Sequence, residues 1–191
     1  MNAPTPHRTS PARPRSLGRA RAVPVPSTPL LARALPHVDW SDAYAVPVPR
    51  GSSASALEWA DLIFHSPPAW VRGLFVAREA LAGIAGIERG GSHVFETVSW
   101  RPGEVLLGTD QAHLAFRASV LVEADRVVVS TVVQVRQRRG RAYSALIGPV
   151  HPIVVRGAMA RARRRVALET PRDPAPATPS LPSICHHVHT T

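Results

Sequence analysis

The chain has 191 residues and a formal net charge of +10, because 23 basic side chains, all arginine, outnumber 13 acidic ones. Its single cysteine, Cys185, excludes an internal disulfide framework. No apolar run approaches the ~20 residues that a membrane span needs, and the N-terminus lacks the apolar segment of a secretory signal. We therefore expect a cytoplasmic protein without a membrane span.

Proline is concentrated at the two ends of the chain. Such stretches bury too little apolar surface to offset the entropy lost when a backbone becomes ordered. We predict a disordered, Arg/Pro-rich N-terminal arm over residues 1–36 and a disordered tail with proline and histidine over 169–191. Residues 37–168 are predicted to form a single α+β domain.

The first predicted strand covers residues 42–49 (DAYAVPVP). Pro47 cannot donate a backbone hydrogen bond, which favours an edge position. Ser55 and Glu58 then have the spacing of a capping box, which predicts the start of a short helix. A second helix is predicted from Ser66 onward, because its apolar side chains recur at helical spacing. These side chains are Trp70, Val71, Leu74, Phe75, Leu81, Ile84 and Ala85.

The remaining elements follow from a change of period. Apolar side chains alternate over residues 93–100, 104–109, 112–123 and 126–137, which predicts four strands. The connections are short, so neighbouring strands should be antiparallel. From residue 140 the helical spacing returns, and Pro149 and Pro152 should kink that helix or divide it. Strands segregated from helices predict an α+β fold, an antiparallel sheet of about five to six strands packed on a long C-terminal helix.

Several short strings resemble those of an uncharacterised bacterial family, domain-of-unknown-function family 2867, over about residues 38–165. The strings are Ser66-Pro67-Pro68-Ala69-Trp70-Val71, His113-Leu114-Ala115-Phe116-Arg117, Gly140-Arg141-Ala142-Tyr143 and Pro149-Val150-His151. The chain departs from the family pattern at Ala115, Gln137 and Val150. Members resemble the helix-grip superfamily, which is START-like or polyketide-cyclase-like. That resemblance implies a curved sheet wrapped on the C-terminal helix, often around a ligand cavity.

The first functional hypothesis is binding of an apolar or amphipathic small molecule. His113 and Arg117 lie on one face of the strand 112–123, where they could bind an anionic or hydrogen-bonding head group near Tyr143 or His151. The candidate ligand-binding residues are Trp70, Glu96, His113, Arg117, Arg141, Tyr143 and His151. This hypothesis predicts an enclosed pocket of ~300 Å³ or more between sheet and helix. The structural alternative is a solvated convex face, or a buried Arg117 paired with Glu96.

The second hypothesis is an enzyme of the cyclase, hydratase or hydrolase type. Histidine exchanges protons near neutral pH, so the candidate catalytic residues are His113, His151 and Tyr143. At least two of them must converge on one pocket. No nucleophile-and-base pair and no paired carboxylates are recognisable, so catalysis ranks below binding.

The third hypothesis is a basic adaptor for nucleic acid or an anionic surface. Two arginine runs, 136–141 and 161–165, flank the C-terminal helix. They would lie about 33 Å apart along a straight helix, at two ends of the molecule rather than in one patch, and no specific nucleic-acid motif is present. Cys185 and three nearby histidines suit a soft metal by composition, but a lone cluster in a tail predicts no metal site. We expect no cofactor.

Overall fold

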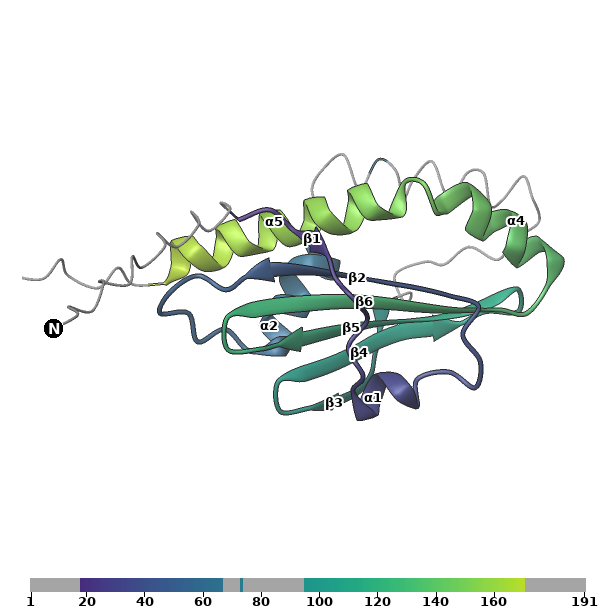
Figure 1. The fold of residues 1–191 in the computed structure, drawn as a ribbon, viewed down its shortest axis with the longest axis horizontal. Coiled ribbons are helices and arrows are strands. Elements are labelled where there is room, and N and C mark those ends of the chain that lie inside the picture. The colour runs from purple at the N-terminus through teal and green to yellow at the C-terminus, as the bar shows by residue number, and fades with distance from the viewer. Residues whose placement is uncertain (1–17, 67–72, 74–94, 171–191) are drawn as a thin grey trace, which may run out of the picture.

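The computed structural model, shown in Figure 1, describes residues 18–66, 73 and 95–170. Its centre is a curved, six-stranded antiparallel sheet with the strand order β1-β2-β6-β5-β4-β3. The strands are β1 (Arg21–Ala22), β2 (Trp40–Pro47), β3 (Thr97–Arg101), β4 (Glu104–Asp110), β5 (Leu114–Val122) and β6 (Arg126–Val135). The predicted antiparallel connections of the last four strands are confirmed. The first predicted strand is β2, and only the two residues of β1 pair with its outer side.

The C-terminal helical region consists of two helices, α4 (Arg138–Ile147) and α5 (His151–Glu169). The helical structure is interrupted between them around Pro149, and Pro152 lies in the first turn of α5. Proline has no amide hydrogen and cannot continue the helical bonding pattern, so the predicted division is confirmed. Both helices run along one face of the sheet (Figure 1), which we call the inner face.

The main core lies between this inner face and α5. Inward side chains of the strands, such as Val46, Leu107 and Val129, pack with Met159 of α5, and all four are almost fully buried. Helix α2 (Ala56–Ala60) contributes Trp59, and the π-helical turn η1 (Asp61–His65) follows it directly. The capping box predicted for α2 is confirmed: the Glu58 amide donates to Ser55 Oγ, and the Ser55 amide donates to the Glu58 carboxylate.

The prediction of disorder up to residue 36 is wrong for residues 18–36. This segment forms β1 and the short helix α1 (Pro29–Ala32), and it crosses the outer face of the sheet (Figure 1). Leu31 and Leu35 are buried there against outward side chains of three strands, Leu106, Ala115 and Val132. Proline content misled the prediction, because proline suits both an extended segment and the first turn of a helix.

This covering segment explains the composition of β6. Val127 and Val129 face inward, and Val128 and Val132 face outward, yet each is at most 4% exposed.

Most of the second predicted helix, including Trp70, and the predicted terminal disorder of residues 1–17 and 171–191 lie outside the described residues. Within the described part of the chain, no helix has the length and apolar character needed to span a membrane.

Candidate functional site

A cavity of about 450 Å³ lies between the inner face of the sheet and the helices α4 and α5. The sequence predicted an enclosed pocket, whereas this cavity is partly open to solvent. Its size exceeds the predicted minimum and lies in the range of small-molecule sites. Most of its lining is aliphatic or aromatic. The described lining residues are Trp40, Ile63, Phe64, Phe95, Gln111, Leu114, Phe116, Ala118, Thr131, Val133, Tyr143, Ser144, Ala145, Ile147, Gly148, Val150, His151, Val154, Val155 and Ala158. None of them carries a carboxylate or a guanidinium group.

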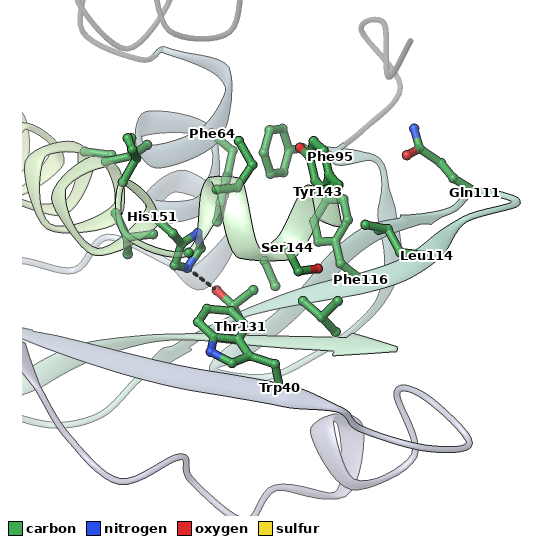
Figure 2. Close-up of a pocket in the computed structure, with 18 of the residues that line it drawn as sticks. Trp40, Phe64, Phe95, Gln111, Leu114, Phe116, Thr131, Tyr143, Ser144 and His151 are labelled. Atoms are coloured by element: carbon green, nitrogen blue, oxygen red, sulfur yellow. Dashed lines mark hydrogen bonds between the residues drawn. The ribbon is translucent and has the colours of Figure 1, made fainter. Parts of the chain in front are cut away.

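His151 is a polar residue of the cavity lining, and its side chain contacts the sheet. It is the first residue of α5, and its Nε2 atom lies 3.3 Å from Thr131 Oγ1 and 3.3 Å from Asp42 Oδ1. Figure 2 shows the imidazole turned toward Thr131. The ring of Trp40 meets the imidazole edge-on, with the ring centroids 5.1 Å apart. Three elements, β2, β6 and α5, therefore fix the orientation of one histidine.

Asp42 stands behind this histidine on β2, opposite Thr131 of β6. Its side chain is 17% exposed, and its Oδ2 atom is buried without a hydrogen-bond partner among the described residues. Burial raises the pKa of the neighbouring Tyr44 hydroxyl, and the Asp42 carboxylate raises that pKa further. The Asp42 carboxylate thus interacts both with His151 and with the Tyr44 phenol.

The opposite end of the cavity is set by the junction between β5 and α4. His113 precedes β5 and is 4% exposed, and its ring meets that of Tyr143 edge-on at a centroid distance of 5.7 Å. Gly140 lets the helix approach this closely, because a Cβ atom there would lie 2.3 Å from the carbonyl oxygen of His113. Tyr143 lines the cavity, whereas His113 is not part of the lining and contacts the ring of Tyr143.

Arg117 and the other charged candidates do not line the cavity. Arg117 points to the outer face, where its Nη2 atom lies 2.6 Å from Asp110 Oδ2, so its ionic partner is not the suggested Glu96. Glu96 and Arg141 are exposed. Trp70 lies outside the described residues. Of the seven candidate ligand-binding residues, the structure brings Tyr143 and His151 to the cavity.

The pair of Asp42 and Thr131 was missed by the sequence analysis. A signal for Thr131 was present, since it is a hydroxyl side chain inside the valine-rich strand RVVVSTVVQV. Asp42 was placed in a strand without a role, because its partner His151 lies 109 residues away. The phenylalanines of the cavity wall, Phe64, Phe95 and Phe116, belong to separate elements and carried no common pattern.

The two arginine runs belong to different ends of the molecule. Arg138, Arg139 and Arg141 lie at the start of α4, and residues 161–165 lie in the second half of α5, at the far end of the sheet (Figure 1). Arg163 donates a hydrogen bond to the carbonyl oxygen of Pro47. In the described ranges, no group of three or more metal-binding side chains gathers, and Cys185 lies outside them.

Comparison with protein families identifies a match. The family model described as "Protein of unknown function (DUF2867)" matches residues 34–158, more than half of the chain. The chain belongs to this family. The matched range contains the cavity helix α4 and the start of α5, and it begins just before the outward-packed Leu35, so β1 and α1 lie outside the matched range. No curated protein and no solved structure matches the chain.

Proposed function

We propose that this domain binds a small, mostly apolar molecule in the cavity between the sheet and the helices α4 and α5. The observation that carries the proposal is the cavity of about 450 Å³ with an aliphatic and aromatic wall. An apolar molecule would cover this wall better than water does, because removing apolar surface from water is favourable. Resemblance to helix-grip proteins, in which this space often holds a ligand, supports the same proposal.

The polar side chains of the wall suit an amphipathic ligand. His151 and Thr131 lie on the sheet side, and Tyr143, Ser144 and Gln111 lie toward α4 and the β4–β5 connection. A few polar groups within an apolar lining orient a ligand without dominating its affinity. The apolar part of the ligand would contact Phe116, Ala118 and their neighbours.

A fluorescence titration with N-phenyl-1-naphthylamine tests this proposal. The probe is neutral and apolar, and its emission rises when it leaves water. We expect saturable binding with one probe per chain. Ala118 and Ala158 both line the cavity and are nearly buried, so Ala118→Phe or Ala158→Leu should fill the space and abolish saturable binding.

Trp100→Ser is the matched control. Trp100 lies on β3, at the edge of the sheet, and is 67% exposed, so this substitution removes apolar surface outside the cavity and should leave probe binding unchanged. Circular dichroism of each variant reports whether it is folded. Absence of saturable binding by the wild type, or equal binding by both folded cavity-filling variants, would refute the proposal.

A second candidate function is acid–base catalysis in the same cavity. The observation that favours it is the Asp42–His151 pair, because a carboxylate that orients an imidazole is a common arrangement for a general base. Tyr143 and His151 both line the cavity, which meets the condition that two candidate residues share one pocket. Once a ligand with a reactive carbonyl or a hydratable double bond is found, unchanged turnover by His151→Phe would dismiss this candidate.

A further inference from the structure

We infer that the cavity selects a neutral ligand that donates a hydrogen bond, and that Asp42 sets this preference by fixing the tautomer of His151. The inference rests on the proposed binding function and names the chemical class of its ligand. Suitable molecules are apolar alcohols, phenols and amides with one N–H or O–H group. Asp42 is a positioning residue, since it acts on the ligand through His151.

The position of the proton on His151 follows from its neighbours. The Asp42 carboxylate only accepts hydrogen bonds, and the imidazole atom that faces it at 3.3 Å is Nε2. In the neutral imidazole one nitrogen carries the proton and the other is an acceptor. Nε2 must therefore carry the proton, shared between Asp42 Oδ1 and Thr131 Oγ1. Nδ1 is left as the acceptor.

The Nδ1 atom is available to accept a hydrogen bond. It has no hydrogen-bond partner among the described residues, and it is not one of their buried, unpartnered polar atoms. In Figure 2 the second ring nitrogen lies on the side of the imidazole away from Thr131, and His151 is part of the cavity lining. A ligand hydroxyl or N–H group that reaches Nδ1 would satisfy it.

The described part of the cavity lining offers no counter-charge to an anionic ligand. The described lining residues include no arginine, and the charge nearest to His151 is the carboxylate of Asp42. Arg117, which the sequence suggested for an anionic head group, is bound to Asp110 on the outer face. Burying an anion without a counter-charge costs far more than burying a neutral hydroxyl group. The cavity should therefore discriminate against carboxylates.

The tautomer can be measured without any ligand. Long-range ¹H–¹⁵N correlation spectra of uniformly labelled protein at pH 8 distinguish a protonated ring nitrogen from a bare one. We expect His151 to show a protonated Nε2 and a bare Nδ1. Asp42→Asn replaces an obligate acceptor with an amide that can also donate, and it should shift the signals toward a mixture of tautomers.

Asp61→Asn is the matched control for the spectra. It removes one negative charge from an exposed position on η1 and should leave the tautomer of His151 unchanged. A bare Nε2, an imidazolium with both nitrogens protonated, or an unchanged tautomer in Asp42→Asn would overturn the inference.

Ligand selectivity is the second arm of the test. Displacement of N-phenyl-1-naphthylamine by 1-decanol, nonyl methyl ether and decanoate, at pH 8, compares a donor, an acceptor and an anion that have ten carbons each. We expect 1-decanol to bind about five- to tenfold more tightly than the ether, the worth of one net hydrogen bond. Decanoate should bind least tightly.

Two variants and one control variant test whether His151 and Asp42 cause this preference. His151→Phe keeps an aromatic ring but removes the acceptor, so 1-decanol and the ether should bind equally, with ether binding reporting that the cavity is intact. Asp42→Asn should reduce the alcohol preference while Asp61→Asn keeps it. Equal wild-type binding of all three molecules, or tightest binding of decanoate, overturns the inference and leaves the binding function standing. If neither the probe nor any of these three molecules binds, the proposed function itself fails.

Discussion

Thr28 donates a hydrogen bond of 2.7 Å from its Oγ1 atom to the carboxylate of Glu104, which is 1% exposed. The same hydroxyl oxygen accepts from the Leu31 amide and caps α1. One side chain therefore begins the helix and attaches it to the outer face of the sheet. Ser119 donates a second bond of 2.7 Å to the same carboxylate oxygen.

Thr28→Val should destabilise the fold by about 2 kcal/mol, because it removes a helix cap and one of the two hydroxyls that bond the buried carboxylate. Ser119→Ala removes only the other hydroxyl and should cost about 1 kcal/mol. Glu104→Gln should cost less than about 1 kcal/mol, because an amide oxygen can accept both bonds. Urea denaturation of the three variants checks this order. Equal stability of Thr28→Val and wild type would contradict it.

The Asp110 carboxylate should stabilise the fold in a pH-dependent way. Burial alone would raise the pKa of Asp110, but hydrogen bonds and charge from Arg117, and then from Arg136, outweigh burial and lower it. A lowered pKa in the folded state contributes stability above the ordinary value of 3.8, and that stability is lost as pH falls through the folded value. Because the Asp110 side chain is 48% exposed, solvent screening limits the contribution to about 1 kcal/mol.

Denaturation of wild type and Asp110→Asn between neutral and strongly acidic pH checks the predicted contribution of Asp110 to stability. The variant should be less stable at neutral pH, and the difference should shrink below the ordinary carboxyl pKa. Glu123→Gln is the control, since it removes a carboxylate from an exposed pair with Arg126 and should change stability by less than about 0.5 kcal/mol. A difference that stays constant into acid would contradict the role of Asp110.

Tyr44 should limit stability at alkaline pH. Burial and the adjacent Asp42 carboxylate raise the pKa of its hydroxyl above the ordinary value of 10.0. A raised pKa means that the folded state favours the neutral phenol, so its contribution is complete below that ordinary value and is lost as pH rises through the folded value. Tyr44→Phe has no such group. Its stability relative to wild type should therefore rise with alkaline pH in denaturant titrations, and parallel curves would count against this assignment.

Gly140→Ala should be destabilising although alanine favours helices. The added Cβ atom would lie 2.3 Å from the backbone oxygen of His113, so α4 must move away from β5 at a cost of about 1–3 kcal/mol. Arg138→Ala, at an exposed position in the same helix, should change stability by less than about 0.5 kcal/mol. Thermal unfolding of the two variants separates steric conflict from helix propensity, and similar midpoints would contradict the close approach.

The strands and their order in the meander were predictable, because period-two patterns and short turns act locally. The same holds for the helix break at Pro149 and for the cap formed by Ser55 and Glu58. The covering segment 18–36 was not predictable from composition. Its prolines indicated disorder, whereas the burial of Leu31 and Leu35 depends on an apolar outer face that exists only once the sheet has formed.

The candidate site was predictable only in part. Tyr143 and His151 were identified as candidates, because their side chains can bond a ligand or exchange a proton and both belong to the C-terminal helical region that the sequence predicts. Arg117 was assigned to the wrong face, because both faces of β5 are buried and alternation alone cannot tell which one meets α5. The partnership of Asp42 with His151 depends on β2 pairing with β6, a long-range register that short sequence windows do not contain.

The central claim is that the space between the sheet and the helices α4 and α5 holds a ligand, and chemical-shift mapping tests it most directly. In two-dimensional NMR spectra titrated with 1-decanol, the largest saturable shifts should occur at lining residues such as Phe116, Thr131 and Ser144. Val98 and Trp100, exposed apolar residues of β3, should remain unshifted. Saturable shifts confined to β3, or no saturable shifts at all, would contradict the claim.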